Sequence, residues 1–504
     1  MKSSYYFILV LFAFASCASS KNLKNTPREE FRGVWVATVV NIDWPKNGND
    51  STSKQKRDFI EILDFYENLN FNAIIVQVRT AGDALYPSQL APWSKYLTGQ
   101  QGKAPKGFED PLSWMIQETH TRGMEFHAWL NPYRATFDMD TLSLDVTHDF
   151  NQHRDWMIKY GKKFYYNPGL PQVRNKFAKV VEELVDNHDI DAIHFDDYFY
   201  PYKIKDETFD DSLTYQSNKL VNQSLDDWRR SNVDSLVKQV HSTIKKSKPW
   251  VQFGISPFGV WRNKDVDPKG SDTKAGQTNY DDLYANPLLW MEKGWIDYIA
   301  PQAYWSMDYP PASHRKVSEW WSIQKGMVNL YMGNGPYKIK NNSDKAWNKY
   351  NEIPKQLKFA RSLPKVNGNI FFSAKSLLNK HPKTVKKIRK LYASPVPNPT
   401  LKTPNKRTLE PLKIETKKIQ DDKVQIRLNH FDNIPRFALF YVNKGKKKGR
   451  LPLFKKSYLS SRKDNIQVDV PISGKTKRQG ILIVIQDVYG NKTQPIILNP
   501  KQLQ

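Results

Sequence analysis

Two adjacent aspartates, Asp196 and Asp197, stand directly after a short apolar run at residues 192–195. Carboxylates that share a closed site repel each other, and this repulsion drives their pKa values apart so that one can act as an acid and the other as a base. Hydrolysis of a glycosidic bond needs such a pair, because one acid protonates the leaving oxygen while a second carboxylate acts as nucleophile or as base for water. We therefore take Asp196 and Asp197 as the candidate catalytic residues, with the alternative that one of them only caps the next helix.

A partner acid further from this pair is harder to assign. Asp43, Asp83 and Asp272 each follow another apolar run, where an aspartate is commonly a turn residue. Asp272 is retained as a substrate-binding candidate. No glutamate stands just after the seventh run, which argues against the barrel enzymes that use paired glutamates from their fourth and seventh strands.

Aromatic, amide and arginine side chains gather at the ends of the same runs. Flat aromatic rings offer stacking surfaces for sugars, and arginine binds carboxylates through two parallel hydrogen bonds. Arginines in these positions would suit carboxylated or N-acetylated sugars, unless each pairs with a neighbouring aspartate. Besides Asp272, the predicted substrate-binding residues are Gln77, Arg79, Asn131, Tyr133, Arg134, His194, Tyr198, Trp261, Arg262, Gln302, Tyr304 and Trp305.

The sequence lacks the patterns that are typical of metal and cofactor sites. His127 and His194 have neither His-x-x-x-His spacing nor clustered acidic residues beside them. The single cysteine excludes a thiolate metal cluster, and there is no glycine-rich phosphate loop and no serine-nucleophile elbow. We expect neither a metal nor a cofactor.

Eight short β-branched or apolar runs would position these side chains. They cover residues 33–40, 73–79, 125–130, 192–195, 252–256, 298–301, 330–332 and 369–372. Amphipathic stretches lie between them; in residues 54–69, Phe59, Leu63 and Tyr66 recur at helical spacing. This alternation predicts an α/β fold with parallel strands, and eight units favour a closed (β/α)8 TIM-like barrel over residues 29–393. The carboxyl ends of barrel strands meet at one face, so the candidate residues should converge there.

The composition changes after residue 393. Residues 394–408 are rich in proline and predict a stiff linker. Five further apolar runs alternate with turn signals between residues 409 and 504, namely 424–428, 437–442, 466–470, 481–485 and 496–498. This pattern predicts a small C-terminal β-sandwich of immunoglobulin- or fibronectin-like type.

The first residues have the features of a bacterial lipoprotein signal. A lysine precedes an apolar run that is too short to span a bilayer, and small residues lead to Cys17, the only cysteine of the chain. Residues 1–17 are therefore expected to be a signal peptide with its lipidation box, and residues 18–28 a polar tether. The alternative is an ordinary signal peptide with an incidental cysteine. Lipidation of Cys17 would anchor the chain to a membrane of the cell envelope, facing the periplasm.

The formal charge is +26 over 504 residues. Such a field attracts polyanions such as nucleic acid, anionic lipid headgroups or an acidic wall polymer, and charge alone does not choose among them. With an export signal present we expect no nucleic-acid partner, and we expect a monomer.

Five long motifs resemble the glycosyl-hydrolase-like ten family and occur in that family's order. They are FRGVWVATV at 31–39 with DWP at 43–45, HAWLNPYR at 127–134, HFDDYFYP at 194–201, GISPFGVWRN at 254–263 and YIAPQAYW at 298–305. The resemblance covers about residues 29–392. It implies an envelope lipoprotein that hydrolyses O-glycosidic bonds, and one branch of the family acts at the division site on peptidoglycan glycan strands stripped of their peptides.

Three functions follow from these observations. We expect a glycoside hydrolase acting on a glycan polymer of the envelope, most simply peptidoglycan strands. A glycan-binding lipoprotein without catalysis is the alternative, and it would lack a second carboxylate within roughly 5–10 Å of Asp196. A polyanion-binding protein driven by net charge would instead show steeply salt-dependent binding.

Overall fold

The computed structural model describes residues 27–402 and, within the C-terminal domain, residues 409, 411–420, 423–428, 431, 433–443, 451–459 and 466–503. The expected signal peptide, Cys17 and most of the tether lie outside the described residues, as does the second part of the proline-rich linker. No helix among the described residues has the length and apolar character needed to cross a bilayer.

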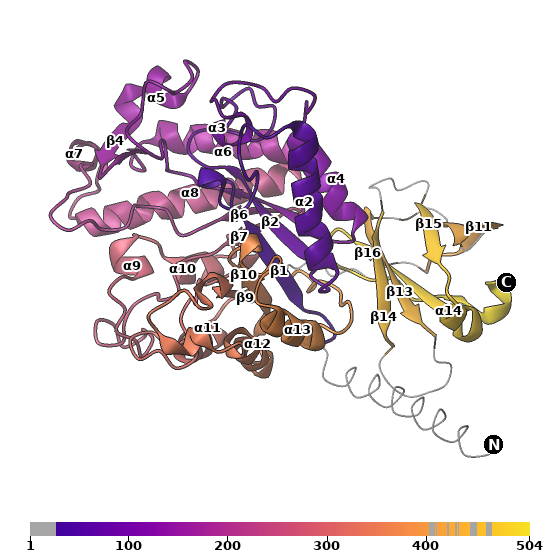
Figure 1. Cartoon of the computed structure of the whole chain (residues 1–504). Coiled ribbons are helices and arrows are strands. Elements are labelled where there is room, and N and C mark those ends of the chain that lie inside the picture. The colour runs from indigo at the N-terminus through magenta and orange to yellow at the C-terminus, as the bar shows by residue number, and fades with distance from the viewer. Residues whose placement is uncertain are drawn as a thin grey trace.

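Eight parallel strands close into a barrel, with helices packed around it (Figure 1). The closed order is β1-β10-β9-β8-β7-β6-β3-β2. The strands are β1 (Phe31–Val36), β2 (Ala73–Arg79), β3 (Glu125–Leu130), β6 (Ala192–Phe195), β7 (Gln252–Ile255), β8 (Tyr298–Ile299), β9 (Asn329–Asn334) and β10 (Val366–Phe371). Every predicted run contributes one strand, so the (β/α)8 fold class is confirmed.

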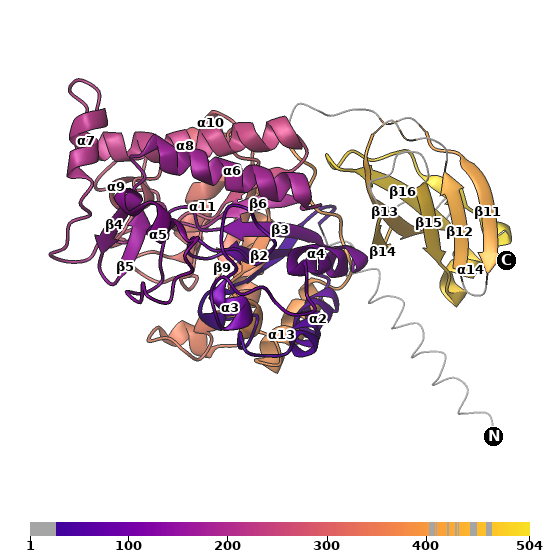
Figure 2. The same cartoon turned by 90° about the horizontal axis from the view of Figure 1, so that it is seen from above.

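At least one helix follows each strand and covers the outside of the barrel. The larger ones are α2 (Thr52–Glu67), α4 (Pro111–Thr121), α6 (Pro171–Asn187), α8 (Leu225–Ser247), α10 (Pro287–Glu292), α11 (His314–Ser322), α12 (Glu352–Ser362) and α13 (Pro382–Leu391). In α2, Ser51 caps the first turn by accepting a hydrogen bond from the Lys54 amide, and Phe59, Leu63 and Tyr66 are buried on the barrel side. Figure 2 shows α6 and α8 side by side over β3 and β6.

Shorter elements decorate the loops. They are α3 (Lys95–Thr98), α5 (Asp149–Gln152), α7 (Ser212–Asn218) and α9 (Asn279–Asp282), with the 3-10 turns η1 (Val39–Asn41), η2 (Arg154–Trp156), η3 (Pro336–Lys338), η4 (Lys345–Asn348) and η5 (Ala374–Ser376). Two elements differ from the sequence prediction. The first strand ends at Val36 and turns into η1, and a hairpin of β4 (Met157–Tyr160) and β5 (Lys163–Tyr166), which the sequence did not indicate, lies between β3 and α6.

The inside of the barrel is filled by aromatic side chains and two histidines. The Trp35 indole N–H donates to Nε2 of His194 over 3.1 Å, and the Tyr298 hydroxyl lies 2.9 Å from Nδ1 of both His194 and His127. Gly254 leaves room for the Tyr298 ring, with which any side chain at that position would collide. The barrel is therefore a packed core with no central pore, and binding space can open only above it.

The C-terminal domain consists of two antiparallel sheets, ordered β11-β12-β15 and β14-β13-β16-β17. The strands are β11 (Ile414–Gln420), β12 (Lys423–Leu428), β13 (Pro435–Val442), β14 (Leu453–Tyr458), β15 (Ile466–Pro471), β16 (Ile481–Asp487) and β17 (Ile496–Leu498), accompanied by α14 (Gly474–Gln479) and η6 (Pro500–Gln502). Val424, Val468 and Ile483 belong to one apolar core shared by the two sheets. This is the predicted β-sandwich; β11 and β14 were not among the predicted runs.

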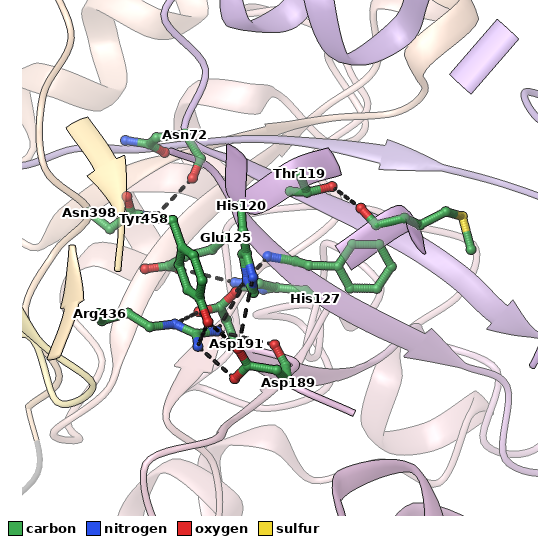
Figure 3. Close-up of polar contacts among 12 residues, drawn as sticks. Asn72, Thr119, His120, Glu125, His127, Asp189, Asp191, Asn398, Arg436 and Tyr458 are labelled. Atoms are coloured by element: carbon green, nitrogen blue, oxygen red, sulfur yellow. Dashed lines mark hydrogen bonds and ion pairs between the residues drawn. The ribbon is translucent and has the colours of Figure 1, made fainter. Parts of the chain in front are cut away.

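The sandwich docks on the amino ends of the barrel strands through a buried ionic cluster (Figure 3). Arg436 of β13 donates to both Asp191 (2.6 Å) and Asp189 (2.7 Å), which directly precede β6. Tyr458 of β14 also hydrogen bonds to Asp189, and its ring stacks on His120 at 4.2 Å. Burial alone would raise the pKa of Asp191, but the charge of Arg436, with His120, lowers it well below the usual range. The sandwich therefore occupies the face opposite to the carboxyl ends of the strands.

Candidate active site

A cleft of about 810 Å³ opens at the carboxyl ends of the barrel strands, a volume within the range of roughly 300–1,000 Å³ that is typical of ligand pockets. Polar and aromatic side chains line it, among them Trp35, Gln77, Arg134, Lys163, Asp196, Asp197, Tyr198, Tyr202, Gln302 and Tyr304. Asp196 and Asp197 are the acidic side chains of this lining, and both are nearly buried, with exposed fractions of 5 % and 2 %.

Asp196 sits at the floor of the cleft, one residue past the end of β6. It accepts hydrogen bonds from the Asn131 amide (2.5 Å) and from the backbone N–H of Tyr198 (3.3 Å). Burial, followed by the neighbouring charge of Asp197, raises the pKa of Asp196 to about 7. A carboxyl group with this pKa holds a proton on a large share of molecules at neutral pH, as a general acid requires.

Asp197 has a different set of partners. It accepts hydrogen bonds from the Tyr202 hydroxyl and from Nε2 of Gln302, the latter over 3.0 Å. Burial raises the pKa of Asp197, while these two donors act in the opposite direction and favour its ionised form. The two adjacent carboxyl groups thus have unlike hydrogen-bond partners, while burial raises the pKa of both.

A chain of amides fixes the position of Asp196. Gln77, at the end of β2, accepts hydrogen bonds from the backbone N–H groups of Thr38 and Val39 over 3.1 and 3.0 Å. Its amide N–H₂ donates over 2.6 Å to the Asn131 side chain, which in turn donates to Asp196. Because every amide in the chain has its donor and acceptor roles assigned, the carboxyl group is held in one orientation.

Aromatic rings form the walls of the cleft. Those in the lining are Trp35, Trp129, Phe137, Tyr198, Tyr202, Phe258, Tyr304, Trp305, Tyr309, Tyr337 and Phe372. The rings of Tyr304 and Phe372 are inclined by 28° to each other, with their centres 5.9 Å apart. Flat apolar surfaces that surround two carboxyl groups fit a ligand with alternating apolar faces and polar edges, which describes a sugar chain.

The structure brings together six predicted substrate-binding residues with the aspartate pair: Gln77, Arg134, Tyr198, Gln302, Tyr304 and Trp305 line the cleft. Asn131 lies just beneath it. His194 is fully buried below the cleft, and burial lowers its pKa well below the usual value, so it is a neutral part of the barrel core. Tyr133 is fully buried in the apolar core between the strands and the outer helices.

Four other predicted residues lie away from the cleft. Arg79 is buried among Asp149, Tyr166 and Phe177 in a separate small cavity. Trp261 stacks on Trp320 with ring centres 5.9 Å apart. The remaining two form ion pairs: Arg262 with Asp267 (2.9 Å) and Asp281 (2.8 Å), and exposed Asp272 with Lys316 (2.5 Å). The alternative of an arginine paired with an aspartate therefore applies to Arg262.

The two other candidate partner acids, Asp83 and Asp43, stabilise loops by accepting backbone hydrogen bonds. Asp83 caps the loop after β2 by accepting hydrogen bonds from the backbone N–H groups of Thr80 and Ala81, both at 2.9 Å. Asp43 accepts bonds from the Ala37 and Lys375 amides, at 2.7 and 2.9 Å. Neither lines the cleft, so the adjacent pair on β6 is left as the acidic centre.

Sequence reasoning missed several cleft residues. Tyr202 lies four residues after Tyr198 within the same aromatic stretch, which was a usable signal. Lys163 begins β5, Lys338 ends η3, and Lys274 lies in the long loop after β7, so none of the three directly follows a predicted strand. Within the part of the chain that the structure describes, no group of three or more histidine, cysteine or acidic side chains is placed to hold a metal ion.

A closed (β/α)8 barrel with a carboxylate pair in an aromatic cleft at the carboxyl ends of its strands defines a hydrolase of the glycosidase type. The sequence profile of the family described as glycosyl hydrolase-like 10 matches residues 30–349. The chain therefore belongs to the glycosyl hydrolase-like 10 family and is a glycoside hydrolase.

Individual relatives agree with this assignment. The chain is 48 % identical over 402 residues to the glycosyl hydrolase YngK of Bacillus subtilis, covering 78 % of each chain. It is 38 % identical over 367 residues to the glycosyl hydrolase DigH of Escherichia coli K12, covering 68 % of this chain and 83 % of the relative. Among solved structures, the PgaB (BpsB) glycoside hydrolase domain from Bordetella bronchiseptica is similar, with a TM-score of 0.48 at 14 % identity over 71 % of this chain and 98 % of that one.

Proposed function

We propose that this chain cleaves O-glycosidic bonds in peptidoglycan glycan strands, with Asp196 as the proton donor and Asp197 as the ionised carboxylate. The observation that carries the proposal is the unlike environment of the two neighbouring carboxyl groups in one cleft. Asp196 has its pKa raised to about 7, and Asp197 receives the Tyr202 hydroxyl and the Gln302 amide.

The roles follow from what each group can do. Asp196, when protonated, gives its proton to the glycosidic oxygen as the bond to the anomeric carbon breaks, and the amide chain from Gln77 through Asn131 keeps it directed at that oxygen. Asp197, held negative, faces the positive charge that develops on the sugar ring in the oxocarbenium-like transition state. Water then attacks the anomeric carbon and gives one proton to the Asp196 carboxylate, which restores the acid.

The choice of peptidoglycan rests on the resemblance of the five barrel motifs to envelope lipoproteins that act on denuded glycan strands, together with the membrane anchor expected at Cys17. An envelope anchor would place the cleft beside this polymer. The location of the chain in the envelope and its lipid anchor belong to the same proposal.

The test is digestion of purified denuded and intact peptidoglycan, with the soluble products identified by mass. We expect new reducing ends from the denuded strands with the wild-type chain, and losses of at least about 100-fold with Asp196→Asn and Asp197→Asn. Binding of strands without cleavage by the wild-type chain would support the alternative of a glycan-binding lipoprotein. Equal turnover by all three proteins would refute the assignment of the aspartate pair.

A further inference from the structure

Two cations, Arg134 and Lys163, lie in the wall of the cleft. Among the described residues neither forms an ion pair, and Asp138, the acid that follows Arg134 in the chain, is paired instead with Lys95 at 3.2 Å. Arg134 is only 6 % exposed, and Lys163 is half-buried. The charge of Arg134 lowers the pKa of both Asp196 and Asp197, but among the described residues no hydrogen bond joins its guanidinium to either carboxyl group. The hydrogen-bond donors of both cations therefore stay available to a ligand.

The other two arginines predicted at the site, Arg79 and Arg262, do not line the cleft as Arg134 does. Arg262 is neutralised by Asp267 and Asp281, and Arg79 lies in a different cavity with Asp149 in its lining. Arg134 stacks over the Tyr198 ring, 4.6 Å from its centre, next to the aspartate pair. Of these three arginines it is the one that keeps its guanidinium for a ligand.

The β4–β5 hairpin brings Lys163 to this place. The segment after β3 is hydrogen bonded to it along the backbone: the Ala135 and Thr136 amides donate to the Phe164 carbonyl over 3.1 and 3.0 Å, and the Tyr166 amide donates to the Tyr133 carbonyl over 2.8 Å. Both cations face one ring, since Lys163 Nζ lies 4.6 Å and the Arg134 guanidinium 5.8 Å from the centre of Phe137. The pair is thus held by a rigid element.

The charge of the whole cleft has the same sign. Its lining contains four basic side chains, Arg134, Lys163, Lys274 and Lys338, against two acids. One of those acids, Asp196, has its pKa raised to about 7 and therefore carries a proton on about half of the molecules at neutral pH. Burial, followed by the charge of Arg134, lowers the pKa of Lys163, which shows that the two cations repel each other and would gain from a shared anion.

We propose that Arg134 and Lys163 form a subsite for a carboxylate carried by a sugar of the substrate, next to the bond that is cleaved. This inference rests on the proposed function and narrows its substrate to glycans with acidic sugars. The planar guanidinium would bind the carboxylate through two parallel hydrogen bonds, and Lys163 would add a point charge. A muramic acid residue whose lactyl group is free presents such a carboxylate, whereas an amide bond to a peptide removes the charge.

The subsite makes Arg134 and Lys163 specificity-determining residues rather than catalytic ones. A role limited to tuning Asp196 would shift the pH profile of Arg134→Gln and leave the ligand preference intact. A carboxylate subsite predicts that ligand preference itself is lost, and that it is lost in Lys163→Gln as well.

The experiment measures binding calorimetrically with the full chain carrying Asp196→Asn, which keeps ligands intact. The ligands are a denuded peptidoglycan tetrasaccharide, its methyl ester, chitotetraose, and a tetrasaccharide that carries uronic acids in place of lactyl groups. We expect the acid to bind roughly 10- to 100-fold more tightly than its ester, as hydrogen bonds to charged groups allow. The affinity for the tetrasaccharide with uronic acids shows whether the subsite prefers a lactyl carboxylate or a carboxylate on the sugar ring.

Arg134→Gln and Lys163→Gln should each reduce the preference for the acid over the ester to about 3-fold or less, with binding of chitotetraose unchanged. Lys159→Gln is the matched control, because Lys159 is an exposed cation on the same hairpin that does not line the cleft. The subsite would be overturned if the parent chain bound acid and ester equally or bound no saccharide. It would also be overturned if both variants kept the full preference for the acid over the ester. If the acid is preferred but the chain without the Asp196→Asn change cleaves no strand, the subsite stands and the proposed hydrolysis fails.

Discussion

Replacing Asp196 by asparagine should make the folded chain more stable at neutral pH while it removes activity. Burial, followed by Asp197, raises the pKa of Asp196 from 3.8 to about 7. One pKa unit corresponds to about 1.4 kcal/mol, so ionising this group in the folded chain lowers the free energy of unfolding by on the order of 4 kcal/mol.

The direction in which the stability changes with pH follows from proton binding. The folded chain binds the proton of Asp196 more tightly than the unfolded chain does, so the wild type is favoured below about pH 4 and loses this stability as the pH rises towards 7. Asparagine cannot ionise and escapes the loss. Unfolding in urea, followed by tryptophan fluorescence between pH 4.5 and 8.5, should show the gap between variant and wild type widening by about 3 kcal/mol in favour of the variant, since the first part of the loss occurs below pH 4.5.

Activity gives an independent measure of the same group. Loss of a general acid lowers the rate by roughly 10²- to 10⁴-fold, but only where the leaving oxygen needs a proton. Asp196→Asn should therefore be slow on glycan strands and much less impaired on a synthetic glycoside with an acidic phenol as leaving group. The wild-type rate on strands should fall as the pH rises through about 7, and the variant should lose this limb.

The control is Asp265→Asn, an exposed aspartate in the loop after β7 that does not line the cleft. It should keep the wild-type rate and the wild-type dependence of stability on pH. A stability gap for Asp196→Asn that does not change with pH would refute the raised pKa of the buried carboxyl group. Equal rate losses on both kinds of substrate would instead refute the acid role.

Three further changes test other parts of the molecule. Tyr202→Phe removes a hydrogen-bond donor from Asp197, so the pKa of that carboxyl group should rise. The acidic limb of the pH–rate profile should then move to higher pH. A limb that stays in place would contradict the role of Asp197 as the ionised group. Arg436→Met leaves Asp191 buried without its cation and should lower the free energy of unfolding by about 3–5 kcal/mol, measured in denaturant, while kcat on soluble strands stays unchanged because the cluster lies on the opposite face. Cys17→Ala should move the protein from the membrane to the soluble fraction and abolish labelling by a radioactive fatty acid; membrane attachment in the variant would refute the lipid anchor.

Local sequence patterns were enough to predict the barrel and the place of its candidate site. Runs such as Ala73–Arg79 and Ala192–Phe195 are buried throughout and mostly apolar, because strands of a parallel barrel are covered on both faces. Between them, helical spacing in residues such as Phe59, Leu63 and Tyr66 is a local property that needs no knowledge of the partner surface. Once eight such units are present, closure sends every carboxyl end to one face, which is why Asp196 and Gln302 could be placed together from the sequence alone.

Contacts between remote segments select which of these residues are free to bind a ligand. Arg79, Arg134 and Arg262 look equivalent in the sequence, and their difference lies in distant partners such as Asp281 that no local pattern reveals. Lys163 reaches the cleft through a hairpin inserted between a strand and its helix. Charge pairing and burial act through space over a few ångströms and therefore depend on contacts between remote segments, whereas strand and helix periodicity is written into neighbouring residues.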